Sequence, residues 1–177
     1  MTPKLKQGLI QVYTGDGKGK TTAALGLALR AAGQGLKVHI IQFMKGWPKY
    51  GELVSVQQLP NVTLRQFGRP DFVDQDNPHP EDIRLAGEAL EHAREIVSGG
   101  SHDLVVLDEV NMAVAFGLIG LEDLLSLLEA KPEHVELVLT GRSARPDVVK
   151  RADLVTEMLA IKHPFSTGLE GREGIEY

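Results

Sequence analysis

The sequence predicts an α/β fold, in which a mostly parallel β-sheet carries helices on both faces. Short apolar segments alternate with longer helical segments along the 177 residues, and this alternation requires crossover connections between parallel strands. The segments at residues 104–107 and 135–139 show no alternation of apolar and polar side chains. Both of these strands are therefore expected to be buried on both faces. The length fits a single domain spanning residues 1–177.

The first half of the chain contains three predicted strands and two predicted helices. Residues 9–13 and 38–43 are short β-prone runs, and residues 62–67 alternate apolar and polar side chains, which favours a less buried strand. Residues 21–34 form an Ala/Leu-rich helix that stops near two glycines, and residues 80–97 form an amphipathic helix. The apolar face of the amphipathic helix is predicted to carry Ile83, Ala86, Leu90, Ala93 and Val97.

The second half continues the same alternation of strands and helices. Its predicted elements are a strand at 104–107, a helix at 121–130, a strand at 135–139, a short helix at 146–152 and a strand at 154–161. Residues 163–177 hold three glycines and are expected to form an irregular tail, and residues 1–7 a short N-terminal arm. Residues 68–80 are rich in Pro, Asp and Asn, which makes them the best candidate for a functional loop or lid.

The composition excludes several classes of function. The net charge of −5 argues against a nucleic-acid partner, and the lack of cysteine excludes disulfides, zinc thiolates, iron–sulfur clusters and a cysteine nucleophile. The six histidines are scattered, so a transition metal held by the protein is not expected. No apolar run approaches the roughly 18 residues of a membrane span, and the first residues lack the apolar core of a signal peptide. We therefore expect a cytoplasmic protein without a membrane partner.

The stretch TGDGKGKTT at residues 14–22 predicts a phosphate-binding loop. It follows a predicted strand and opens a predicted helix, so that backbone N–H groups and the helix N-terminus would face one anion. Lys20 would add a charge, and the Thr21 hydroxyl would reach Mg²⁺. The leading glycine of the usual pattern would fall at residue 14, where this chain has Thr14, and it stands instead at Gly15.

Acidic residues accompany this loop at two places. Asp108 and Glu109 follow the apolar strand at 104–107, and a carboxylate at the end of such a strand holds Mg²⁺ directly or through water. Either of the two carboxylates is in position to reach the metal. Asp16 lies inside the loop itself, and because an acid repels phosphate we expect it to face a ribose, a metal-bound water or a second ligand.

Three further residues are expected at the same edge of the sheet. Lys45 and Trp47 follow the strand at 38–43, and Arg142 follows the strand at 135–139. Ligands of parallel α/β sheets bind at the carboxyl ends of the strands. Arg142 is therefore either a phosphate ligand or a surface arginine, and Trp47 is either a core anchor or a platform for a ligand.

Taken together, several stretches resemble the ATP:corrinoid adenosyltransferases. In order, they are TGDGKGKTTAALGLALRAAG, IIQFMKG, VVLDEVNMAVAFGLI, LVLTGR and KHPFSTGLEGREGIEY. The glycine-rich loop alone is widespread, whereas its combination with QFMKG, LTGR and a tail that ends in GIEY is much more specific. The resemblance covers the chain from about residue 8 to its last residue. It implies a P-loop NTPase fold of the RecA-like type, a homodimer and an electron-donating reductase as partner.

The resemblance also implies a reaction and the residues that perform it. The cobalt(I) of a reduced corrinoid attacks the 5′ carbon of ATP and expels triphosphate, so ATP, Mg²⁺ and a corrinoid are the implied ligands. Lys20, Thr21 and Glu109 are the implied catalytic residues, and Thr21 and Glu109, with Asp108 as a further candidate, would hold Mg²⁺. The implied ligand-binding residues are Thr14, Gly15, Asp16, Gly17, Lys18, Gly19, Lys20, Thr21, Thr22, Arg30, Lys45, Phe72 and Arg142.

The chain departs from the family pattern at two places. Many relatives carry Phe-Thr-Trp-Glu-Thr before the amphipathic helix, with aromatic residues that cover the corrinoid, whereas residues 68–74 here keep one aromatic residue, Phe72, and lack the tryptophan. Some relatives have a long N-terminal arm that serves as a lid, and residues 1–7 are too short for one. Two other functions remain as alternatives: a conventional P-loop ATPase or kinase, and a non-catalytic nucleotide-binding partner protein.

Overall fold

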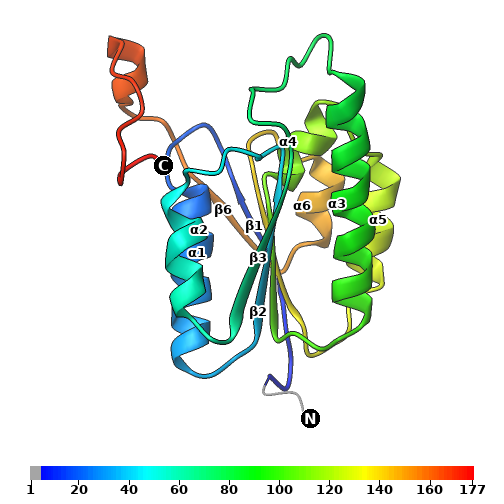
Figure 1. The fold of residues 1–177 in the computed structure, drawn as a ribbon. Coiled ribbons are helices and arrows are strands. Elements are labelled where there is room, and N and C mark those ends of the chain that lie inside the picture. The colour runs from blue at the N-terminus through cyan, green and yellow to red at the C-terminus, as the bar shows by residue number, and fades with distance from the viewer. Residues whose placement is uncertain (1–4) are drawn as a thin grey trace.

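A six-stranded sheet lies between two layers of helices in the computed structural model, which describes residues 5–177 without the side chain of Phe165 (Figure 1). The strand order is β3-β2-β4-β5-β1-β6, and every pair of neighbouring strands is parallel. The strands are β1 (Ile10–Thr14), β2 (Val38–Phe43), β3 (Val62–Phe67), β4 (Leu104–Asp108), β5 (Glu136–Thr140) and β6 (Leu154–Glu157). The predicted α/β class with a parallel sheet is thereby confirmed.

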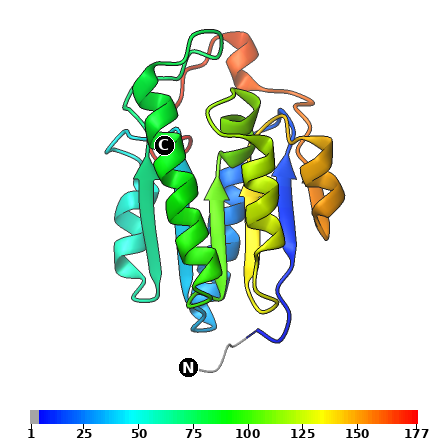
Figure 2. The same ribbon diagram turned by 90° about the vertical axis from the view of Figure 1, so that its right-hand side faces the viewer.

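The helices divide between the two faces of the sheet, as Figures 1 and 2 show. One face carries α1 (Lys20–Gly33) and α2 (Gly51–Ser55), which continues into the 3-10 turn η1 (Val56–Gln58). The opposite face carries α3 (Pro80–Ser98), α4 (Val110–Ala115), α5 (Leu121–Glu129) and α6 (Pro146–Arg151). The tail contains a further 3-10 turn, η2 (Pro164–Thr167), and is otherwise irregular, as predicted.

The central strand β4 shows why its sequence has no alternation. Val105 and Leu107 point into the apolar cluster beneath α3 and α5, while Leu104 and Val106 point into the cluster beneath α1. All four side chains are buried, because helices cover both faces of the sheet at this position. The unbroken apolar run therefore places Asp108, the next residue, at the centre of the sheet's carboxyl edge.

Two predicted details are wrong. The last strand ends at Glu157 rather than at residue 161, because β6 is an edge strand that pairs with β1 over four positions only. Ile83 does not belong to the buried face of α3, since its side chain is 47% exposed. The neighbouring Asp82 is buried instead, where it accepts hydrogen bonds from Arg69 and completes the cap of α3.

Two short helices, α2 and α4, were not predicted. Each spans five or six residues, which is too few for a periodic pattern of apolar residues to appear in the sequence. Of the predicted arm at residues 1–7, residues 1–4 lie outside the described part of the chain. Among the residues that are described, no helix is both long enough and apolar enough to cross a membrane.

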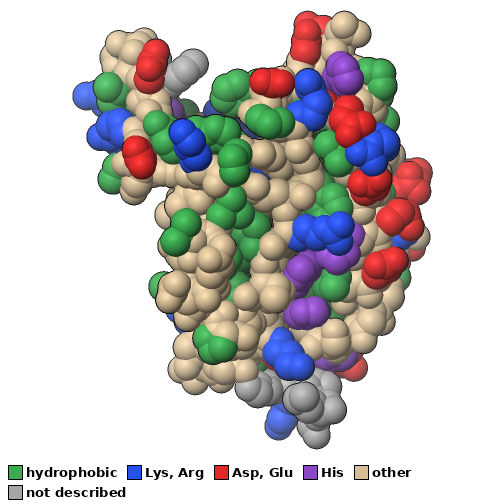
Figure 3. Space-filling model, viewed as in Figure 1, with side chains coloured by type: hydrophobic (Ala, Val, Ile, Leu, Met, Phe, Trp, Pro, Cys, Tyr) green, Lys and Arg blue, Asp and Glu red, His purple; other side chains and the backbone are tan. Residues whose placement is uncertain are grey.

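Histidines that are far apart in the sequence lie together in space. The Nε2 atoms of His39 and His92 are 3.0 Å apart, and the ring centroids of His39 and His102 are 5.3 Å apart. Figure 3 shows histidine side chains gathered on the face of the molecule that the β3 edge presents. Burial lowers the pKa of His39 to about 4, with further lowering by the charges of His102, His92 and Arg65.

Candidate functional site

Three glycines shape the glycine-rich loop, residues 14–22, between β1 and α1. Gly15 and Gly19 have φ angles of 90° and 123°, which side chains rarely allow. At Gly17, a Cβ atom would lie 2.7 Å from the carbonyl oxygens of Leu159 and Met158. The N–H of Gly17 donates a hydrogen bond to the Met158 carbonyl at 2.6 Å, which fixes the loop against the segment after β6. Glycine is therefore required at all three positions.

Thr14 explains why the first glycine stands one position later than usual. It is still part of β1, where it pairs with Glu157 of β6. Its hydroxyl accepts a hydrogen bond from the N–H of Ala144 at 3.3 Å, so it links β1 to the segment that follows β5. The turn begins only at Gly15. Asp16 is exposed on the loop, and the ligand it faces stays a prediction.

Lys20 fills the centre of the glycine-rich loop. Its Nζ donates hydrogen bonds to the carbonyl oxygens of Gly15 and Gly17, at 2.7 and 2.8 Å. Burial lowers the pKa of Lys20, and the negative charge of Glu109 partly opposes this. Within the described part of the chain, no side chain caps the N-terminus of α1, where Gly19 is the capping residue. The ammonium group and the uncapped N–H groups together form a site that suits an anion.

Asp108 is wholly buried at the end of β4 and accepts hydrogen bonds from four side chains. One carboxylate oxygen accepts from the hydroxyls of Thr21 at 2.8 Å and Thr140 at 2.7 Å. The other accepts from Lys45 Nζ at 2.7 Å and Gln42 Nε2 at 3.2 Å. Burial alone would raise the pKa of Asp108, but the charge of Lys45 and these hydrogen bonds hold it below its ordinary value. Asp108 is therefore a buried anion that fixes the start of α1 to three neighbouring segments.

Glu109 has an unusual backbone conformation, and its pKa is shifted in the opposite direction from that of its neighbour Asp108. Its φ is 63°, in the left-handed region, and its N–H donates to the Thr140 hydroxyl at 2.9 Å. Such a conformation costs on the order of 1–3 kcal/mol for a residue with a side chain and is concentrated at functional sites. Burial and the negative charge of Asp108 raise the pKa of Glu109. Adjacent carboxylates with opposite pKa shifts indicate separate roles.

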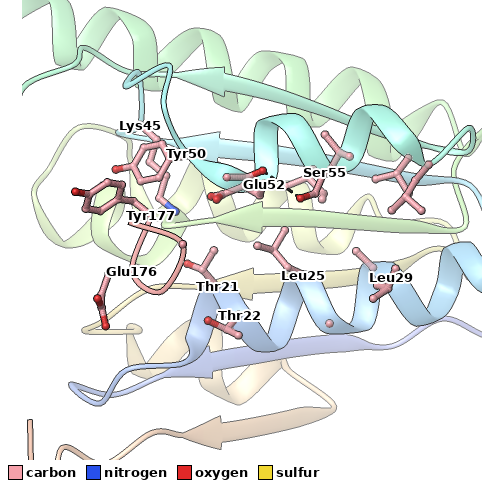
Figure 4. Close-up of a pocket in the computed structure, with 18 of the residues that line it drawn as sticks. Thr21, Thr22, Leu25, Leu29, Lys45, Tyr50, Glu52, Ser55, Glu176 and Tyr177 are labelled. Carbon is pink, nitrogen blue, oxygen red and sulfur yellow. Dashed lines mark hydrogen bonds between the residues drawn. The ribbon is translucent and has the colours of Figure 1, made fainter. Parts of the chain in front are cut away.

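A cavity of about 800 Å³ opens beside the glycine-rich loop, between α1 and α2 (Figure 4). Its interior is apolar and is lined by Leu25, Ala28, Leu29, Ile40, Val56, Leu59 and Val62. Its end at the loop is polar and is lined by Thr21, Thr22, Lys45 and Glu109. The cavity also reaches Glu52, whose carboxylate accepts a hydrogen bond from Gln42 at 3.0 Å. A ligand in this cavity therefore has a polar end at the loop and an apolar remainder.

The structure brings some of the other predicted residues to the site and leaves two outside it. Arg142 is exposed after β5, near enough for its charge to lower the pKa of both Lys20 and Glu109. Arg30 lies in the last turn of α1, about 15 Å along the helix axis from its start, so it does not reach the loop. Phe72 is fully exposed in the segment between β3 and α3.

Several residues of the site were not predicted from the sequence. Gln42 and Thr140 both bind Asp108, and only Thr140 had a signal, its place in the Thr-Gly-Arg stretch at the end of a strand. Tyr50 and Glu52 lie on or next to α2, which has no sequence signature. The last residues, 174–177, line the cavity although they are more than 150 positions from the loop.

Comparisons with known proteins identify the family of this chain. Residues 6–177 match the family described as ATP:corrinoid adenosyltransferase BtuR/CobO/CobP. The chain is 34% identical over 172 residues to a corrinoid adenosyltransferase of Pseudomonas aeruginosa, covering 97% of this chain and 85% of that protein. It is 36% identical over 173 residues to the corrinoid adenosyltransferases of Escherichia coli and Salmonella typhimurium, covering 97% of this chain and 87% of each relative. Because the match spans nearly the whole chain, this protein belongs to the family of ATP:corrinoid adenosyltransferases.

Proposed function

We propose that the glycine-rich loop holds the triphosphate of ATP and that Lys20 is its principal cation. The observation that carries this proposal is the position of the Lys20 ammonium group, 2.7 and 2.8 Å from the carbonyl oxygens of Gly15 and Gly17. A triphosphate carries negative charge and therefore adds Coulomb attraction that the neutral carbonyls lack, so it would take the ammonium group from these carbonyls. The uncapped N–H groups of α1 supply further donors.

The residues at the loop also fit Mg²⁺. This ion is usually held by one or two protein groups together with substrate phosphates, rather than by a complete protein cage. We propose that the Thr21 hydroxyl and the Glu109 carboxylate hold it, where it would neutralise charge on the leaving triphosphate. Both oxygens of Asp108 already accept two hydrogen bonds each, so this carboxylate orients Thr21 and Lys45 rather than binding the metal directly.

The reaction is transfer of the adenosyl group from ATP to the cobalt of a reduced corrinoid. Cobalt(I) supplies an electron pair to the 5′ carbon, a Co–C bond forms, and the bond from that carbon to the phosphate oxygen breaks. Triphosphate leaves with the bonding pair, and the cobalt becomes formally cobalt(III). Because no proton is transferred, no protein base is required. The chain positions ATP, stabilises the charge of the leaving group and excludes water.

A product analysis separates this reaction from the alternative of an ATPase or kinase, which the comparisons do not favour. The protein is incubated anaerobically with MgATP, with and without chemically reduced cobalamin. We expect a light-sensitive Co–C product and intact triphosphate in equal amounts, only when the corrinoid is present. Release of orthophosphate at the same rate without corrinoid would refute the proposal.

We also propose that the protein is a homodimer in solution and that Phe72 contacts the corrinoid. The support for an assembly is β6, an edge strand whose four residues are all exposed, with Leu154 39% and Val155 41% exposed. Unpaired apolar edges are usually covered by another chain or blunted by charge. Sedimentation at micromolar concentration is expected to give the mass of two chains, and a monomer would contradict this.

We further propose that the fold is of the RecA-like type. The position of β5 between β1 and β4 supports this proposal. The reductase partner, the single-domain organisation and the cytoplasmic location stay predictions.

A further inference from the structure

The last four residues of the sequence, 174–177, form one wall of the cavity beside the glycine-rich loop. The cavity is bordered by this segment on one side and by Thr21 and Thr22 of α1 on another. Figure 4 shows Tyr177 beside Tyr50 at the end of the cavity where Thr21 lies, while Glu176 points away from the cavity. The segment therefore borders the end of the cavity that lies at the start of α1.

A latch of charged groups holds this segment to the glycine-rich loop. Lys18 Nζ donates to the Glu176 carboxylate at 2.8 Å and to the carbonyl oxygen of Ile175 at 3.0 Å. Glu176 also accepts hydrogen bonds from the backbone N–H and the guanidinium of Arg172. The hydrogen bonds from Arg172 and from Lys18 lower the pKa of Glu176 to about 2, so the carboxylate of Glu176 is charged at neutral pH.

Three aromatic residues from separate segments meet at the same place. The rings of Trp47 and Tyr177 are 4.8 Å apart between centroids, and those of Trp47 and Tyr50 are 5.5 Å apart, both edge to face. Tyr50 and Tyr177 line the cavity, and Trp47 packs against both of them. Edge-to-face pairs at these distances are attractive, so Trp47 sets the position of the two tyrosine rings.

Burial of apolar surface does not account for the position of the segment. Ile175, its one aliphatic side chain, is 58% exposed. The contacts that hold the segment are instead the Lys18 latch on the loop and the ring contact of Tyr177 with Trp47. Both of these contacts lie at the candidate site. The segment is therefore held in place by the site and not by the hydrophobic core.

We propose that Tyr177, together with Tyr50, is the aromatic wall that positions the adenosine portion of ATP. The cavity joins the start of α1, where the triphosphate is proposed to bind, to an apolar interior that suits a heteroaromatic base. Any nucleobase gains stacking energy next to a tyrosine ring, because the interaction uses the flat face that every base has. Inorganic triphosphate has no such face and makes no use of the wall. The inference rests on the proposed binding of ATP at the loop.

The test compares the affinity of the full chain for two ligands, MgATP and magnesium triphosphate, by titration calorimetry. Tyr177→Leu removes the ring, and it is expected to weaken MgATP binding about tenfold while leaving triphosphate binding unchanged. Tyr177→Phe keeps the ring and is expected to bind both ligands as the wild type does. Equal weakening for both ligands, or no weakening for either, would overturn the assignment.

A matched pair of variants tests the latch. Glu176→Gln removes the partner of Lys18 and is expected to weaken MgATP binding but not triphosphate binding. Glu173→Gln makes the same change of charge three positions earlier, at an exposed side chain with no hydrogen bond or ion pair within the described residues, and is expected to bind both ligands normally. If the two variants behaved alike, the latch would have no specific role and this part of the inference would fall.

Trp47 gives a second readout because it is the only tryptophan. MgATP is expected to change its fluorescence more than triphosphate does, and Tyr177→Leu is expected to remove the difference. A variant that bound MgATP normally but lost affinity for the corrinoid would show that the wall serves the other substrate and would overturn the assignment. These measurements need no turnover. If adenosyl transfer were not observed while the contrast between ATP and triphosphate held, the proposed function would fall and the wall would stand.

Discussion

Lys45→Met tests whether Asp108 is a buried anion whose charge Lys45 balances. The two side chains are 2.7 Å apart, and they are 14% and 1% exposed. Removal of one partner from a buried pair typically costs about 3–5 kcal/mol, since the other charge is left without compensation. The three remaining donors to Asp108 reduce this cost, so we expect a loss of roughly 3 kcal/mol of unfolding free energy at pH 7.

The loss should depend on pH in a defined direction. In the wild type the pKa of Asp108 lies below its ordinary value, so the carboxylate stabilises the fold above the unfolded pKa. In the variant, burial is no longer opposed by Lys45, and the pKa of Asp108 is expected to rise above the unfolded value. The cost of the substitution is then fully present at pH 7 and becomes smaller as the pH falls and the carboxyl group takes up a proton.

Urea unfolding at pH 7 and pH 5 provides the measurement. Lys49→Met is the control, because Lys49 is an exposed lysine in the same connection between β2 and α2. The double variant Lys45→Met with Asp108→Asn has no buried charge to balance, so it is expected to be more stable than Lys45→Met alone. A loss below about 1 kcal/mol, as for an exposed ion pair, or a loss that did not change with pH, would refute the reasoning.

Three further predictions concern other parts of the molecule. Lys20→Ala should lower the rate of adenosyl transfer by several hundredfold, about 3–4 kcal/mol of barrier, because the leaving triphosphate loses its cation; an unchanged rate in a steady-state assay would contradict the role given to Lys20. His39 should contribute a loss of roughly 2–3 kcal/mol of stability between pH 6.5 and 4, because it stays neutral in the folded state down to about pH 4 while it is protonated in the unfolded chain. His39→Gln should remove this part of the loss in urea unfolding, and parallel curves for the two proteins would count against it. Phe72→Ala should raise the KM for the corrinoid more than that for ATP, and equal changes in both constants would show that Phe72 does not contact the corrinoid.

The strands and the larger helices were predictable because each carries its own pattern of side chains. The apolar run at residues 104–107 forced a strand that is buried on both faces, and the spacing of Ala86, Leu90, Ala93 and Val97 forced one face of α3 onto the sheet. The short helix α2 had no such pattern. Its Glu52 accepts a hydrogen bond from Gln42 of β2, and a contact of this kind between separate segments has no local pattern in the sequence.

The candidate site also has a part that the sequence predicts and a part that only the fold brings together. The glycine-rich loop and the acids after β4 are each contiguous in the sequence, so their chemistry was readable there. The network around Asp108 was not, because its donors come from residues 21, 42, 45 and 140 and meet only when β4 lies between β2 and β5. The same holds for Tyr177, whose approach to Trp47 joins segments 130 positions apart in the sequence.

The two hydrogen bonds of Lys20 inside the glycine-rich loop bear on the proposed release of triphosphate. The carbonyl oxygens of Gly15 and Gly17 accept hydrogen bonds from this ammonium group, so under the proposed role of Lys20 the binding of a phosphate is an exchange of acceptors. The reverse exchange would then follow the reaction, with these carbonyls competing with triphosphate for the same cation. Under this proposal, the highly charged triphosphate competes with the carbonyl oxygens of the loop for the ammonium group of Lys20. If Lys20 holds the triphosphate as proposed, we expect these two carbonyl oxygens to favour its release and so to limit product inhibition.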